Sequence, residues 1–248
     1  MCNVLLGLMV SLLIPYVRLR FMVYMHGLDR NRVLDMVAGK VADINLSHPV
    51  RVGVDGGSAS GKTFFADELG DVLRDMGHEV VRVGLDGFHN PCETRHRRGA
   101  LSIEGYVEDS FNYSAVREFV LDPLGPAGDL RYHPEIYDHT VEQSIVSSPI
   151  KVSPSAILIL EGVMLFRDEI VDCFDYKILV QTSNEVALER AKSRDLKHFG
   201  DIDLLLEKYT KRFMPGQLCY REKCSPELIA DAILSNDDWD KPVLKFAP

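Results

Sequence analysis

The chain has 248 residues, 46% of them hydrophobic, and a formal net charge of −9. This length and apolar content support one large α/β domain or, less readily, two small ones. The acidic balance argues against a general nucleic-acid or membrane-surface binder, because both functions need a basic field. The five cysteines are scattered without a C-x-x-C pair. That pattern is typical of reduced thiols and predicts a cytoplasmic protein.

The first 25 residues differ in composition from the rest. An apolar run of eleven residues, Val4–Ile14, precedes Pro15, Arg18 and Arg20. The run is too short to span a bilayer as a helix, and it lacks the flanking features of a signal peptide. We interpret residues 1–25 as an N-terminal apolar extension upstream of the domain, set by a start codon placed too early. A weak membrane anchor is the alternative. A single domain would then occupy residues 26–248, with a first helix at about 29–44.

Residues 56–63 fit the phosphate-binding loop (P-loop) pattern G-x-x-x-x-G-K-[ST] without a mismatch. Apolar residues predict a strand at 50–54 before the loop and a helix at 64–76 after it. That order directs backbone N–H groups and a helix N-terminus at a polyphosphate. We expect Lys62 to bridge the β- and γ-phosphates and the Thr63 hydroxyl to hold Mg²⁺. The nucleotide-binding residues would be Gly56, Gly57, Ser58, Ala59, Ser60, Gly61, Lys62 and Thr63.

Two acidic residues follow apolar strands predicted farther along the chain. Asp86 comes after a strand at 79–85, and Glu161 after a strand at 155–160. The carboxyl ends of parallel strands gather the ligand chemistry of an open sheet. Asp86 could therefore accept the proton of an attacking hydroxyl, and Glu161 could lie near Mg²⁺. The alternatives are a turn residue before Gly87 and a surface glutamate.

Further strands are predicted at 175–181 and 231–235, so strands alternate with helices along the chain. This alternation predicts an α/β fold with a doubly wound parallel sheet. Between these two strands lies an arginine-rich helical stretch, 184–213, with Arg190 and Arg194 one turn apart. Arginines on a mobile helix pair could close over the nucleotide and neutralise the transferred phosphoryl group. A solvated charged helix is the alternative.

Four motifs in this order resemble those of the uridine kinase family, within the superfamily that also includes phosphoribulokinase and bacterial pantothenate kinase. They are the P-loop with Asp55 before it, Leu85-Asp86-Gly87-Phe88-His89, Leu160-Glu161-Gly162-Val163 and Arg190-x-x-x-Arg194-Asp195. The resemblance runs from about residue 48 to 244. It implies a P-loop kinase fold of three α/β/α layers, similar to nucleoside monophosphate kinases, with a helical lid at about 190–216. It also implies that Asp86 is the base for a 5′-hydroxyl and that Tyr137 lies near the nucleobase.

The sequence departs from the family pattern around the acceptor. Family members carry a Phe-Asp-His-Pro segment whose Asp holds the ribose; here only Asp109 is nearby. They also place a His five residues after the Tyr, where this chain has Glu142, while His139 comes two residues after Tyr137. The basic segment 95–99 could bind a phosphate or carboxylate on the acceptor, or be a solvated loop. The expected substrate-binding residues are His89, Arg98, Asp109, Tyr137 and His139.

These observations predict a cytoplasmic, MgATP-dependent kinase of nucleoside salvage that phosphorylates the 5′-hydroxyl of uridine or cytidine. Asp86, Lys62, Arg190 and Arg194 would be catalytic, and Thr63 and Glu161 would hold the metal. A kinase of the same fold for another acceptor, such as pantothenate or a sugar phosphate, is one alternative. A nucleotide-binding regulatory protein without catalysis is another. The resemblance also implies a possible homo-oligomer.

Overall fold

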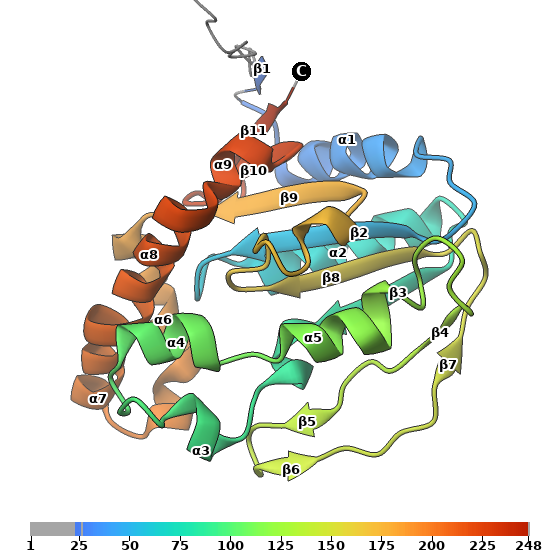
Figure 1. Ribbon diagram of the computed structural model, residues 1–248. Helices are drawn as coiled ribbons and strands as arrows, with labels where there is room; N and C mark the ends of the chain where they lie inside the picture. Colours follow the sequence, from blue (N-terminus) through green and yellow to red (C-terminus); the bar gives the residue numbers. More distant parts are fainter. Residues whose placement is uncertain (1–22, 26, 248) are drawn as a thin grey trace, which may run out of the picture.

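A central sheet organises the protein, which is represented by a computed structural model that describes residues 23–25 and 27–247 (Figure 1). Within these residues the sheet has seven strands in the order β1-β11-β10-β9-β2-β8-β3. The strands are β1 (Val23–Met25), β11 (Val243–Phe246), β10 (Ala232–Ser235), β9 (Tyr176–Gln181), β2 (Val50–Gly56), β8 (Ile157–Gly162) and β3 (Val80–Gly84). Two small pairs lie outside it: β4 (Arg131–Tyr132) with β7 (Ile150–Lys151), and β5 (Tyr137–Asp138) with β6 (Gln143–Ser144).

The five strands from β10 to β3 run parallel, and each was expected from the sequence to within about two residues. The central strands β2 and β8 are buried along their whole length. Strands covered on both faces read as continuous apolar runs, which explains why these segments could be predicted.

The predicted parallel sheet carries two further strands, paired antiparallel, at one edge. β11 pairs antiparallel with β10, and β1 pairs antiparallel with β11. The short connection between β10 and β11 is a hairpin, whereas a parallel neighbour would need a long crossover. The last three residues of the expected N-terminal extension thus belong to the sheet as β1. The rest of that extension, 1–22, lies outside the described residues.

Helices cover both faces of the sheet, which gives the expected three-layer α/β/α architecture (Figure 1). One face packs against α1 (Arg30–Ala42) and α2 (Lys62–Asp75). The other face packs against α4 (Ile103–Asp109), α5 (Tyr113–Val116), the π-helical turn η2 (Arg117–Leu121) and part of α8 (Met214–Cys224). The short elements η1 (Leu85–Phe88), α3 (Cys92–Arg95), η3 (Val171–Cys173) and α9 (Pro226–Ile229) connect these layers.

The elements in which a lid was predicted, at about 190–216, follow β9. They lie beyond the carboxyl ends of the strands, toward which the arrowheads of β2 and β9 point in Figure 1. They are α6 (Asn184–Phe199), α7 (Ile202–Lys208) and the π-helical turn η4 (Tyr209–Phe213). Ala191, Leu205 and Tyr209 pack against Ala59, so the lid contacts the P-loop through an apolar cluster. In the described part of the chain, no helix is both long and apolar enough to cross a bilayer.

Two adjacent phenylalanines on α2 show how much burial in the core contributes to the free energy of unfolding. Phe65 is fully buried, whereas Phe64 is 61% exposed. We expect Phe65→Ala to lower the free energy of unfolding by about 3–5 kcal/mol, since it leaves a cavity beneath the P-loop helix. Phe64→Ala should lower it by less than about 1 kcal/mol. Urea denaturation of both variants measures the difference, and equal losses would contradict the packing described for α2.

Candidate active site

The P-loop connects β2 to α2 and has the backbone shape that an anion needs. Gly61 has a φ of 89°, in the left-handed region that favours glycine. A Cβ on Gly56 would lie 2.6 Å from the carbonyl oxygen of Val180, so only glycine fits there. No side chain caps the N-terminus of α2. The first N–H groups of this helix are therefore available to a phosphate.

The carbonyl oxygen of Ser60 holds the P-loop in place through three donors. It accepts hydrogen bonds from Asn236 Nδ2 at 2.8 Å, Thr182 Oγ1 at 3.1 Å and Arg190 Nη1 at 3.3 Å. Asn236 is fully buried, and its Oδ1 accepts from Arg30 Nη1 at 3.1 Å. The sequence analysis missed Asn236 and Thr182. Their positions directly after β10 and β9 are the signal that could have identified them.

Asp55, the residue before the P-loop, is buried with three hydrogen-bond donors around its carboxyl group. Oδ1 accepts from the backbone N–H groups of Gly56 (2.8 Å) and Leu165 (3.1 Å). Oδ2 accepts from the Tyr220 hydroxyl at 2.6 Å. Burial outweighs these bonds and the nearby charge of Lys62, and it raises the pKa of Asp55 to about 6. Asp55 thus links the start of the P-loop to α8.

Thr63 and Glu161, the predicted metal residues, lie together. Thr63 Oγ1 donates to Glu161 Oε2 at 3.2 Å. Glu161 stands opposite Gly84 on β3 and Val54 on β2. A hydroxyl and a carboxylate oxygen are ligands that suit Mg²⁺. The described residues contain no group of three or more His, Cys, Asp or Glu side chains placed to hold a metal ion. A Mg²⁺ ion held here would therefore complete its coordination with phosphate oxygens and water.

Asp86 lies in η1, immediately after β3, with its side chain 74% exposed. It is therefore two residues beyond Gly84, the register partner of Glu161. His89 Nδ1 lies 2.9 Å from the carbonyl oxygen of Asp86. The His89 ring stacks 4.3 Å from His139. Burial lowers the pKa of His89 to about 4, so this imidazole is neutral at pH 7.

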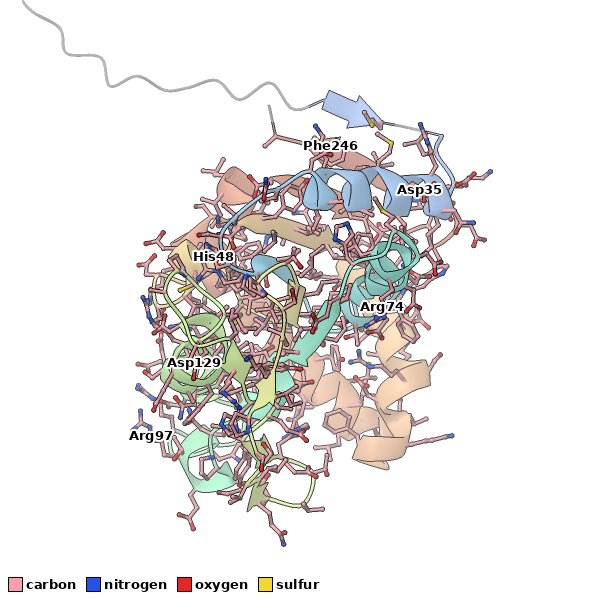
Figure 2. All side chains as sticks on the ribbon, turned by 90° about the vertical axis from the view of Figure 1, so that its right-hand side faces the viewer. Asp35, His48, Arg74, Arg97, Asp129 and Phe246 are labelled. Carbon is pink, nitrogen blue, oxygen red and sulfur yellow. The ribbon has the colours of Figure 1, made fainter. Side chains whose placement is uncertain are left out.

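The expected substrate residues Arg98 and Asp109 form an ion pair with each other. Asp109 is 3% exposed; Arg98 Nε lies 2.7 Å from its Oδ2, and Arg97 pairs with its Oδ1. Arg98 also pairs with Glu104. Figure 2 shows Arg97 at the margin of the molecule. Two arginines of the basic segment 95–99 are thus already neutralised by carboxylates of the chain.

Tyr137 belongs to a small hydrogen-bonded group centred on Glu142. The Tyr137 hydroxyl and the Cys92 backbone N–H each donate to Glu142 Oε2 at 2.9 Å. Arg95 pairs with Oε1 of the same carboxylate. Glu142 therefore connects β5 and α3, a role that the sequence analysis did not foresee. Tyr137 and Glu142 lie close in the chain, but the contact of Glu142 with Cys92 in α3 joins segments about 50 residues apart.

The two lid arginines have different surroundings. Besides Ser60, Arg190 donates through Nη2 to the carbonyl oxygens of Asn236 (2.7 Å) and Asp237 (3.2 Å). Arg194 forms an ion pair with Asp195 at 2.5 Å. Arg190 therefore lies beside the P-loop, and Arg194 lies one helical turn farther out.

A second contact joins α8 to the P-loop. Gln217 Nε2 donates to Ser58 Oγ at 3.0 Å and lies 3.4 Å from the buried Tyr106 hydroxyl. A cavity of about 590 Å³ opens beside this contact. It is lined by Asp55, the loop residues 56–58, the ends of β9 and β10, and α8. Its volume is within the range of small-molecule and cofactor pockets.

The buried Asp55 predicts a measurable pH dependence. Because its folded pKa of about 6 is above the ordinary value of 3.8, the folded protein binds more protons between these values. The stabilisation is complete below about pH 4 and is lost as pH rises through about 6. Relative to Asp55→Asn, whose amide oxygen can still accept both backbone bonds, the wild type should lose about 3 kcal/mol from pH 4 to 7. Urea denaturation of both proteins across this range measures the difference, and a constant offset would contradict the raised pKa of Asp55.

Comparisons with known proteins identify the family of this chain. The model of the Phosphoribulokinase / Uridine kinase family matches residues 51–227. The uridine/cytidine kinase UKL1 of Arabidopsis thaliana is 33% identical over 175 residues, which are 68% of this chain and 34% of the plant protein. The uridine kinase of Ligilactobacillus salivarius is 27% identical over 172 residues, 67% of this chain and 76% of the bacterial protein. This chain thus spans about a third of the plant relative's length.

Solved structures show the same fold. A structure described as a possible uridine kinase from Bacillus stearothermophilus superposes with a TM-score of 0.64 and 20% identity. That match covers 82% of this chain and 97% of the other. Because the family model covers well over half of the chain, this protein belongs to the Phosphoribulokinase / Uridine kinase family.

Proposed function

We propose that this protein is a MgATP-dependent kinase that phosphorylates the 5′-hydroxyl of uridine or cytidine. The observation that carries the proposal is the hydrogen bond between Thr63 and Glu161, with Asp86 at the end of the neighbouring strand. A P-loop hydroxyl, a metal-binding carboxylate and an exposed carboxylate then share one edge of the sheet. This is the arrangement that phosphoryl transfer to an alcohol needs.

The P-loop would bind the triphosphate of ATP. Its backbone N–H groups and the N-terminus of α2 attract the phosphates, and Lys62 adds a positive charge at the start of the same helix. Thr63 and Glu161 would hold Mg²⁺, which neutralises phosphate charge when it is bound. The cavity beside residues 56–58 provides room for further parts of the nucleotide.

Asp86 would act on the acceptor. Its exposed carboxylate accepts the hydroxyl proton as the acceptor oxygen forms a bond to the γ-phosphorus and the bond to ADP breaks. Arg190 would place the lid against the P-loop through its three carbonyl partners, and Arg194 would supply a positive charge one turn farther out. Arg194 must exchange Asp195 for phosphate to do so.

Uridine and cytidine are proposed as acceptors because the named relatives are uridine or uridine/cytidine kinases. Tyr137, His89 and His139 would line the nucleoside side of the site. The dispersed cysteines support a cytoplasmic location, and a homo-oligomer stays a prediction.

A second candidate is a kinase of the same fold for another alcohol, such as pantothenate or a sugar phosphate. The two oxygens of Asp109 are occupied by Arg97 and Arg98, so this carboxylate can hold ribose hydroxyls only if an ion pair opens. ADP release from MgATP with uridine, cytidine, pantothenate and ribulose 5-phosphate distinguishes the two. Tight ATP binding without release for any acceptor would favour a regulatory nucleotide-binding protein.

Replacing the proposed base separates chemistry from binding. We expect Asp86→Asn to lower kcat at least about 100-fold, because the amide cannot accept the proton. ATP affinity should change less than about twofold, since Asp86 does not contact the P-loop. Steady-state ADP release and equilibrium nucleotide binding test both parts. A rate above a tenth of wild type would exclude Asp86 as the base.

Lys62→Ala tests the P-loop as the binding site for the phosphates of ATP. The lysine is 8% exposed at the start of α2, so the variant removes a buried positive charge beside the phosphates. We expect ATP affinity to fall at least about tenfold, and kcat to fall as well. Arg74→Ala, which removes a half-exposed positive charge from the far end of the same helix, is the control. Unchanged ATP affinity in Lys62→Ala would argue against the P-loop as the nucleotide site.

A further inference from the structure

Arg212 in η4 is a buried cation without a carboxylate partner. It is 4% exposed and reaches residues 95–100, the acceptor loop. There Nη2 donates to the carbonyl oxygen of Arg95 at 3.3 Å, and Nη1 donates to that of Ala100. Its Nε has no hydrogen-bond partner. Across residues 23–25 and 27–247, no Asp or Glu lies within ion-pair distance of it. Buried charges are ordinarily paired, so Arg212 is an exception that needs explanation.

Two more cations share this environment. Lys208 precedes Arg212 by four residues on the lid, and it too has no ion pair within the described part of the chain. Burial, followed by the charges of Arg212 and Arg95, lowers the pKa of Lys208. Arg95 is paired with Glu142, yet its own Nε is buried without a partner. Of these three cations, only Arg95 has a carboxylate partner within the described residues.

The pKa of His96 indicates the sign of the electrostatic potential beside these cations. Its pKa is lowered by burial and then by Arg212, Lys208 and Arg95, while Glu142 acts in the opposite direction. The positive charge therefore exceeds the negative charge around the imidazole.

Neighbouring cations do not add to this excess of positive charge, because carboxylates neutralise them. Arg97 and Arg98 are neutralised by Asp109, and Lys211, three residues after Lys208, pairs with Glu207 at 2.9 Å. The unbalanced charge is therefore confined to the side of the lid that faces the acceptor loop.

The excess charge lies close to the proposed reaction. The guanidinium carbon of Arg212 is 5.7 Å from the centre of the Tyr106 ring. The Tyr106 hydroxyl meets Gln217, which donates to Ser58 of the P-loop. Burial is the main cause that raises the pKa of this phenol, and the charges of Asp86 and Arg212 shift that pKa in opposite directions. The cations therefore stand on the acceptor side of the P-loop.

We propose that Arg95, Lys208 and Arg212 form an oxyanion-binding subsite that takes the phosphate or carboxylate group of a small molecule. Guanidinium groups and a lysine that are partly withdrawn from water suit such a group. The subsite goes beyond the proposed kinase function, because anion binding here does not depend on which hydroxyl is phosphorylated. The oxyanion could be carried by the acceptor or be a free inorganic ion.

The test measures binding of inorganic phosphate to the full chain by calorimetry, in a Lys62→Ala background that weakens phosphate binding at the P-loop. Adding Lys208→Gln should weaken phosphate binding at least about fivefold. Adding Lys211→Gln, which removes the same charge from the same helical segment, should change it less than about twofold. Arg212→Gln should abolish binding, but Lys208→Gln decides the test if that variant does not fold. Equal effects at Lys208 and Lys211, or no saturable phosphate binding, would overturn the proposal.

Ribose 5-phosphate and uridine 5′-monophosphate, titrated into the same proteins, distinguish the sources of the anion. Tighter binding than inorganic phosphate, lost in Lys208→Gln, assigns the subsite to a phosphate carried by the acceptor or product. Binding no tighter than inorganic phosphate assigns it to a free anion. These measurements involve no turnover, so failure of the proposed kinase activity in the wild type leaves their result readable.

Discussion

The carbonyl oxygen of Ser60 is the point on which the arrangement of the site depends. Its donors come from the segments after β9 and β10 and from α6. One of them, Asn236, is in turn held by Arg30 at the start of α1, and Arg30 pairs with Glu68 on α2. A backbone carbonyl that is drawn outward by three donors leaves the opposite N–H groups of the loop free for phosphate. The loop thus keeps its shape only when both faces of the sheet are assembled around it.

Much of the P-loop side of the site could be predicted from the sequence, because short-range patterns in the sequence determine it. The P-loop pattern, the buried strands and the acidic residues after them all follow from short-range periodicity and from the convergence of parallel strands at one edge. Thr63 and Glu161 are 98 residues apart, yet both were predictable, because each follows a strand of recognisable pattern. Helix α2 was predicted at 64–76 and is observed at Lys62–Asp75, with Met76 directly after its end.

The acceptor half could not be predicted in the same way. The basic segment contains three arginines that look alike in the sequence, but the fold pairs Arg97 and Arg98 with Asp109, and Arg95 with Glu142. Arg212 meets Ala100 across 112 residues, in irregular structure without periodicity. Such pairings depend on side-chain geometry after folding, and composition alone does not reveal which charges are left unpaired.

Two arginines without a carboxylate partner among the described residues also connect the lid to the P-loop and to the acceptor loop. Arg190 fastens the start of the lid to the P-loop, and Arg212 fastens its end to the acceptor loop through two backbone carbonyls. Between them lie α7 and Lys208, which carry few such anchors. An anion that neutralises Lys208 and Arg212 together would lower the repulsion between lid and acceptor loop. Anion binding at the proposed subsite would therefore stabilise the contact between η4 and the acceptor loop.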